Sequence, residues 1–107
     1  MSEPYAARFE LVEWEEEAPG GRAKPVEVDG ARWALVEYEA GAGRPEWCST
    51  PHCGFVLEGA LRYEFEDGRE PLALVAGQGF LLPASPPPRG RNHGAETARL
   101  FVADDPV

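Results

Sequence analysis

The stretch GQGFLLPASPPPRGRN, residues 77–92, places glycine, proline and asparagine at fixed offsets. It has the form G-x5-P-x-S-x2-P-x3-N on Gly77, Pro83, Ser85, Pro88 and Asn92. Four of the six residues at 83–88 are proline, which has no backbone N–H to donate to a sheet ladder. Segment 83–88 is therefore predicted to be an extended loop or a sheet edge, directly after an apolar run at 80–82.

Short apolar runs between turn residues predict an all-β chain. In residues 61–66, Leu61, Tyr63 and Phe65 alternate with charged residues, which is typical of a half-buried antiparallel strand. Further strands are expected at 9–14, 32–39, 72–75, 80–82 and 98–102. The 12 glycines and 11 prolines interrupt the chain too often for long helices. Many short strands with frequent turns predict a sandwich or a barrel.

The length of 107 residues predicts one domain, and the formal net charge of −9 limits its partners. That charge repels phosphate backbones and anionic membrane surfaces, so neither nucleic acid nor membrane is an expected partner. No long apolar run that could span a membrane is present, and the acidic N-terminus lacks the apolar core of a secretory signal. We therefore expect a cytoplasmic location, where Cys48 and Cys53 stay reduced.

Upstream of the proline-rich stretch, Glu46, Cys48, His52 and Gly59 form a second set of spaced residues. The two sets resemble the two conserved motifs of the cupins, H-x-H-x3-4-E-x6-G and G-x5-P-x-G-x2-H-x3-N. In this register Glu46 and Cys48 take the positions of the two histidines of the first motif, and His52 takes that of the glutamate. In the second motif serine replaces one glycine, and Pro88 replaces the histidine.

The resemblance implies a fold and leaves the activity open. It implies a cupin-type jelly roll, or double-stranded β-helix barrel, in which residues 40–103 carry the motifs and residues 1–39 supply the leading strands. The cupins include dioxygenases, isomerases, epimerases, storage proteins and sensor domains, and many small members are homodimers. A homodimer is therefore expected here too. No substrate can be identified from the sequence, because fold does not determine function.

The resemblance also implies a metal site at Glu46, Cys48 and His52. Side chains two apart on a strand share a face, which would bring Glu46 and Cys48 together, and the family register adds His52. A carboxylate, a thiolate and an imidazole suit a divalent metal such as Zn²⁺ or Fe²⁺. Pro88 has no side-chain ligand, and three protein ligands would leave one position for water or substrate.

Other readings of these residues stay open. Cysteine is often simply a small buried hydrophobe, and a single histidine is often a hydrogen-bonding residue. His93, five residues after Pro88, is an alternative fourth ligand. Cys48 and His52 could instead form a nucleophile and base, with Glu46 as the orienting group.

The expected function is binding of a small molecule inside the barrel, with or without the metal. A barrel of this size holds one small ligand, and Tyr63 and Trp33 are the predicted lining residues. Arg89 and Arg91 flank Pro88 and could pair with an anionic ligand. The alternative is a metal-dependent enzyme of oxygenase, isomerase or hydrolase type. Gly59 is expected to supply a left-handed turn between two strands.

Overall fold

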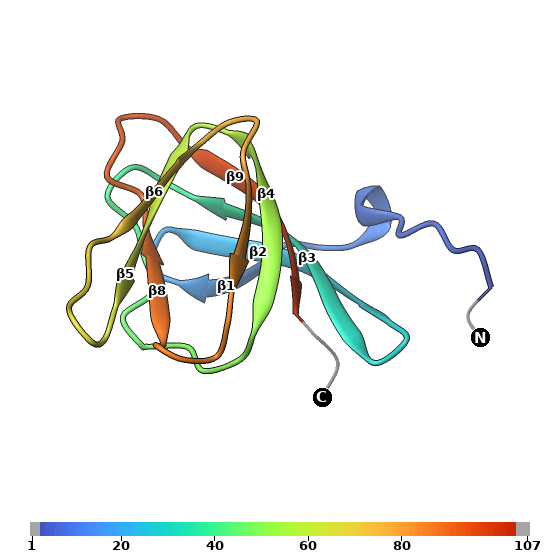
Figure 1. Ribbon diagram of the computed structural model, residues 1–107. Helices are drawn as coiled ribbons and strands as arrows, with labels where there is room; N and C mark the ends of the chain where they lie inside the picture. The colour runs from blue at the N-terminus through green and yellow to red at the C-terminus, as the bar shows by residue number, and fades with distance from the viewer. Residues whose placement is uncertain (1–2, 105–107) are drawn as a thin grey trace.

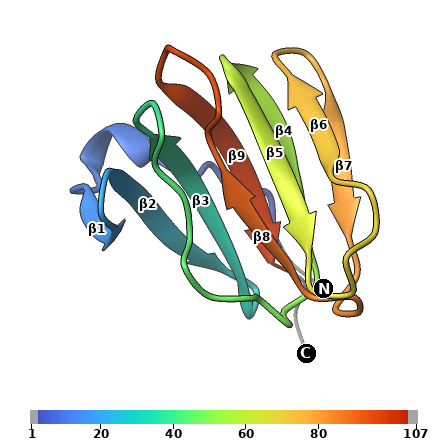
Figure 2. The ribbon, with the colours of Figure 1, turned by 90° about the vertical axis from the view of Figure 1, so that its left-hand side faces the viewer.

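The computed structural model describes residues 3–104, which form two antiparallel sheets packed face to face (Figures 1 and 2). One sheet has six strands in the order β1-β2-β3-β9-β4-β7, and the other has three in the order β6-β5-β8. The strands are β1 (Glu15–Ala18), β2 (Gly21–Val28), β3 (Ala31–Tyr38), β4 (His52–Glu58), β5 (Ala60–Phe65), β6 (Leu72–Val75), β7 (Gly79–Leu82), β8 (Pro88–Arg91) and β9 (Ala98–Asp104). This is the all-β jelly roll that the sequence predicts.

The strand order brings the end of the chain into the middle of the larger sheet. The last strand, β9, pairs with β3 on one side and with β4 on the other. Figure 2 shows the strands of the smaller sheet lying over those of the larger one. Residues from opposite ends of the chain therefore share one inner surface. Within residues 3–104, no helix is long and apolar enough to cross a membrane.

The core lies between the sheets and follows the alternation of the strands. Leu61 and Tyr63 on β5 are buried, whereas Arg62 between them is exposed. They face buried Val56 and Leu100 of the larger sheet within one apolar cluster. Apolar burial of this kind stabilises a fold by about 25 cal/mol per Å² removed from water. The period-2 pattern of residues 61–66 is thus confirmed.

The structure changes several predicted elements. Residues 9–14 were expected to form a strand, but Phe9–Leu11 is a short 3-10 turn. Strands β1 and β2 are the leading strands instead. They were not expected from the sequence, because glutamate and proline are uncommon in strands. The proline-rich segment is a loop that ends in the edge strand β8, starting at Pro88. Gly59 has a φ of 73° between β4 and β5, as predicted.

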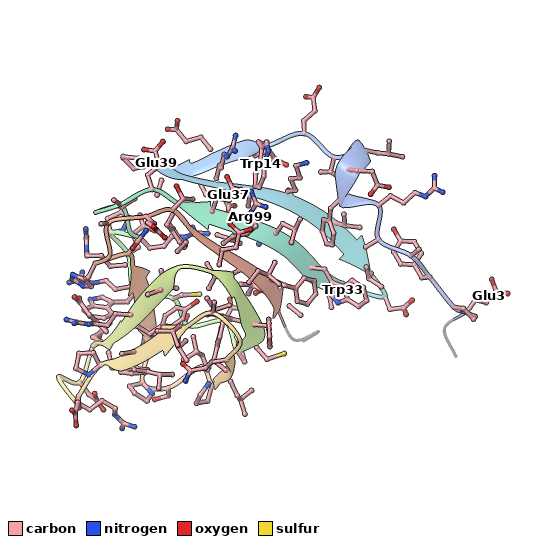
Figure 3. All side chains as sticks on the ribbon, turned by 90° about the horizontal axis from the view of Figure 1, so that it is seen from above. Glu3, Trp14, Trp33, Glu37, Glu39 and Arg99 are labelled. Carbon is pink, nitrogen blue, oxygen red and sulfur yellow. The ribbon has the colours of Figure 1, made fainter. Side chains whose placement is uncertain are left out.

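One charged side chain, Glu37 of β3, is buried on the outer face of the larger sheet. Its Oε1 accepts hydrogen bonds from Arg22 Nε at 2.9 Å and Nη2 at 2.7 Å. Its Oε2 accepts hydrogen bonds from Arg99, with Nε at 2.8 Å. Glu37 and Arg99 lie close together on the face that Trp14 partly covers (Figure 3). The carboxylate therefore joins β2, β3 and β9 across their outer surface.

We predict that Glu37→Gln destabilises the fold in a pH-dependent way. Burial raises the pKa of Glu37, but the bonds from Arg22 and Arg99 lower it by more, so the folded pKa lies below the ordinary 4.5. The stabilisation is present above about 4.5 and is lost as the pH falls through the folded pKa. The loss should be about 1–3 kcal/mol at pH 7, measured by urea unfolding.

The control for this variant is Glu27→Gln, since Glu27 is exposed. Its unfolding free energy should match the unsubstituted chain at both pH 7 and pH 3. A deficit in Glu37→Gln that is as large at pH 3 as at pH 7 would contradict the role given to the charged carboxylate.

Candidate functional site

A cavity of about 300 Å³ lies at one end of the space between the two sheets. Its walls come from inward positions of the larger sheet, from β5 and β8, and from the segment 44–48. The volume is at the lower end of the range for small-molecule sites, roughly 300–1,000 Å³. The lining residues include Glu17, Arg32, Val36, Tyr38, Arg44, Glu46, Trp47, Cys48, His52, Tyr63, Pro88, Arg89, Leu100, Val102 and Asp104.

Backbone hydrogen bonds hold the segment 41–48 against the edge strand β8. The amide of Arg44 donates to the carbonyl of Gly90 at 2.9 Å, and the amide of Cys48 donates to the carbonyl of Pro88 at 2.8 Å. Gly41 and Asn92 are joined in the same way at 2.9 Å. The chain between β3 and β4 thus runs beside β8 and closes the cavity on that side.

All four residues at the cupin ligand positions line this one cavity. Glu46, Cys48, His52 and Pro88 come from the connecting segment, from β4 and from β8. Glu46 and Cys48 were expected to share one face of a strand, whereas both lie in the irregular connection between β3 and β4 and are exposed. Their convergence therefore depends on how segment 41–48 is anchored to β8, and not on strand alternation.

His52 is the one predicted ligand that is buried, whereas Glu46 and Cys48 are exposed. It is the first residue of β4, and its side chain is buried. Its Nδ1 lies 3.0 Å from the carbonyl oxygen of Thr50, to which it can donate. That bond favours the tautomer with a free lone pair on Nε2. The ring faces Tyr63, with a centroid distance of 6.3 Å.

The metal fit of this site is poor. Pro88 offers no side-chain donor, and Cys48 points its sulfur toward the carbonyl of Thr50 at 3.9 Å. Within residues 3–104, no group of three or more His, Cys, Asp or Glu side chains is arranged to hold a metal ion. The set Glu46, Cys48 and His52 shares a cavity without forming such a cluster. Metal binding through it stays a prediction.

The cavity holds a cluster of charges that the sequence argument missed. Glu17 of β1 accepts from Arg32 Nη2 on Oε2 and from Arg44 Nη2 on Oε1, both at 2.8 Å. The Nε of Arg44 also donates to the Tyr38 hydroxyl at 3.4 Å. Burial lowers the pKa of Arg44, but Tyr38 and Glu17 raise it by more, so its pKa lies above the usual value. Arg44 is thus a fixed cation in the wall.

Asp104 is another charged residue of the cavity that was not expected from the sequence. It ends β9, directly between Arg32 of β3 and His52 of β4 in the strand register. It lines the cavity with both of these residues. Arg32 lies on the same face of β3 as Ala34 and Val36, because residues two apart on a strand point the same way. This spacing could have indicated an inward position for Arg32. The opposite face of that strand is also apolar, so the sequence alone could not decide which face is buried.

The other sequence-predicted residues divide between the cavity and the outside. Tyr63 lines the cavity, as expected, and Trp33 does not: its ring packs edge-on against Phe101, 5.9 Å away. Trp33 failed as a prediction because it lies on the outer face of β3. Arg89 lines the cavity and stacks over Trp47 at 4.1 Å.

Two polar residues after Pro88 do not line this cavity. Arg91 donates from Nη1 to the carbonyl of Gly41 at 3.0 Å, which helps to anchor the segment 41–48. The exposed His93 lies 3.8 Å from a carboxylate oxygen of Glu64. Among the described residues, His93 is not one of those that line the cavity. The expectation that it supplies a fourth ligand therefore has no support from its position.

Similar folds are found among solved cupin structures. The cupin domain of Cnp3 from Schizosaccharomyces pombe superposes with a TM-score of 0.76 at 16% identity, covering 95% of this chain and 74% of that one. An RmlC-like cupin from Shewanella frigidimarina gives 0.75 at 19% identity, covering 98% and 93%. The polyketide cyclase RemF from Streptomyces resistomycificus gives 0.76 at 16%, covering 95% and 79%. No protein-family model and no curated protein sequence matches the chain.

These likenesses establish that the chain has the cupin fold. They extend over nearly its whole length, including the leading strands before the motif region. At these identities they carry no activity with them, because one fold supports many unrelated chemistries.

Proposed function

We propose that this cupin-fold protein binds a small organic molecule in the cavity between its sheets. The observation that carries the proposal is the convergence of polar and apolar groups on one cavity of about 300 Å³. Apolar wall comes from Val36, Leu100 and Val102, and polar groups come from Arg44 and Tyr63. An apolar pocket with a few converging polar groups is typical of small-molecule sites.

A metal-dependent enzyme using Glu46, Cys48 and His52 is the second candidate. One observation favours it: the Nδ1 of His52 faces a backbone carbonyl, as the outer nitrogen of a metal-binding histidine commonly does. Against it stand the proline at position 88 and the exposed, unclustered Cys48 and Glu46.

We also propose that two copies associate through the outer face of β4, β7 and β9. Phe55 and Leu81 are exposed there, with Cys53 and Phe101 as their neighbours in the strand register. None of these four residues is charged, whereas the whole chain has a net charge of −9. A second copy meets least repulsion at an uncharged patch, and apolar patches on a sheet face are common contact sites.

We predict that a thermal-shift screen will find a ligand and that Val102→Phe will abolish its effect. A compound at 100 times its dissociation constant adds about 2.7 kcal/mol, which is a shift of roughly 10 °C for a domain of this size. The larger ring fills the cavity that Val102 lines. Val75→Phe is the matched control, since Val75 is exposed and does not line this cavity.

The screen should contain carboxylic acids, amino acids, sugars, sugar phosphates and aromatic alcohols. A hit that stabilises Val102→Phe as strongly as the unsubstituted chain would place binding elsewhere. The absence of any hit across these classes would count against the proposed function.

The two candidate functions differ in metal content: small-molecule binding requires none, whereas the metal-dependent enzyme predicts one zinc or iron ion per chain in protein purified without chelators. Elemental analysis by mass spectrometry, repeated after loading with Zn²⁺ or Fe²⁺ and desalting, measures this directly. One metal ion per chain, lost in both Cys48→Ser and His52→Ala, would establish the metal-dependent alternative. Cys53→Ser is the control, because Cys53 does not line the cavity.

For the dimer, we predict that Leu81→Glu produces a monomer. Leu81 is 69% exposed, so the substitution should leave the fold intact while placing a charge in the apolar patch. Leu11→Glu, at a site 70% exposed in another part of the molecule, is the control and should stay dimeric. Light scattering on a sizing column gives the mass; a monomeric unsubstituted chain would disprove the proposal.

A further inference from the structure

The cavity gathers hydrogen-bond donors that the protein itself does not use. The Nη1 of Arg44 has no hydrogen-bond partner among residues 3–104, although its Nε and Nη2 are engaged. The hydroxyl of Tyr38 accepts from that Nε, which leaves its own hydrogen to donate. Tyr63 is buried, lines the cavity and has no hydrogen bond from its hydroxyl within the described residues.

Tyr63 remains a donor at any pH the protein would meet. Burial, with the nearby Tyr38, raises the pKa of its phenol far above the usual range. The hydroxyl is thus neutral and retains its hydrogen. No buried side-chain oxygen or nitrogen of the described chain lacks a partner, so this unbonded hydroxyl must reach the open space of the cavity. It is available to a ligand oxygen.

The acidic groups of the cavity limit the ligand to a single negative charge. Glu17 is shared by Arg32 and Arg44, and Asp104 lies beside Arg32 in the strand register. These four groups are balanced. Glu46, which is exposed, and Arg89 also line the cavity, so its three acidic residues are matched by three arginines. The cavity thus offers no excess of positive charge to a ligand with several negative charges, whereas one carboxylate can be held by directed donors.

We propose that the ligand is a small monocarboxylate, whose carboxylate accepts hydrogen bonds from Arg44 and Tyr63. Its apolar body would lie against Val36, Leu100 and Val102, which line the same cavity. The free Nη1 is suited to this role, because a hydrogen bond between a charged guanidinium and a carboxylate is short and strong. Glu17 and Tyr38 engage Nη2 and Nε and so fix the orientation of the guanidinium before a ligand arrives. This inference rests on the proposed function and specifies its ligand class.

Matched acid and amide pairs test the inference on the unsubstituted protein. Benzoate with benzamide, and cinnamate with cinnamamide, differ mainly in the charge of one group. We expect the acids to raise the melting temperature and to bind at least about tenfold more tightly in calorimetry, as a hydrogen bond to a charged group implies. Amides that bind as tightly as their acids would overturn the inference.

Two variants locate the effect. Arg44→Gln should remove the preference for acid over amide, and Tyr63→Phe should weaken acid binding several-fold while keeping the ring. Tyr5→Phe is the control, because Tyr5 is exposed and does not line the cavity. Arg44→Gln loses the hydrogen bonds to Glu17 and Tyr38 and could fail to fold. In that case the Tyr63→Phe variant and the comparison of acids with amides still test the inference. An acid preference unchanged in Tyr63→Phe and in any folded Arg44→Gln would refute the assignment.

The outcomes also separate this inference from the function on which it rests. If neutral alcohols or sugars stabilise the protein and Val102→Phe removes the effect, the proposed binding function is supported and the monocarboxylate ligand class is wrong. If neither acids nor neutral compounds bind, both are wrong.

Discussion

The site depends on the backbone contact between the segment 41–48 and the edge strand β8. Four amide-to-carbonyl bonds join the segment to β8 and to Asn92 just after it: Gly41 to Asn92, Asn92 to Ala42, Arg44 to Gly90 and Cys48 to Pro88. A long connection between strands is otherwise free to lie away from the sheets. Here it is fixed along the mouth of the cavity, which brings Arg44, Trp47 and Cys48 to the positions from which they can face a ligand.

Pro88 is compatible with the cupin fold but removes the side-chain donor that the cupin motif has at this position. Its carbonyl accepts the amide of Cys48, and its position on an edge strand tolerates the missing N–H. The residue thus serves the backbone as well as a histidine would. It cannot serve a metal, because its side chain has no donor atom. The fixed positive charge of the cavity comes instead from Arg32 and Arg44, which share Glu17.

Much of the fold could be predicted from the sequence, because its features are local. The alternation at 61–66, the glycine turn at Gly59 and the proline-rich edge each depend on a few neighbouring residues, and each is present. Strands β1 and β2 were not predicted, since EEEA and GRAKPVEV lack the apolar content expected of strands. They are stabilised by pairing with each other and with β3, which is information held elsewhere in the chain.

The candidate site was predicted only in part. Glu46, Cys48, His52 and Tyr63 line the cavity, and the metal role of the first three stays a prediction, yet Glu17, Arg32 and Arg44 were not recognised. These three lie on separate segments, and no spacing relates them. Their meeting follows from β1 and β3 lying in one sheet and from the segment 41–48 crossing toward them. A charge cluster made by three distant segments is found from coordinates, because no local pattern of the sequence relates its members.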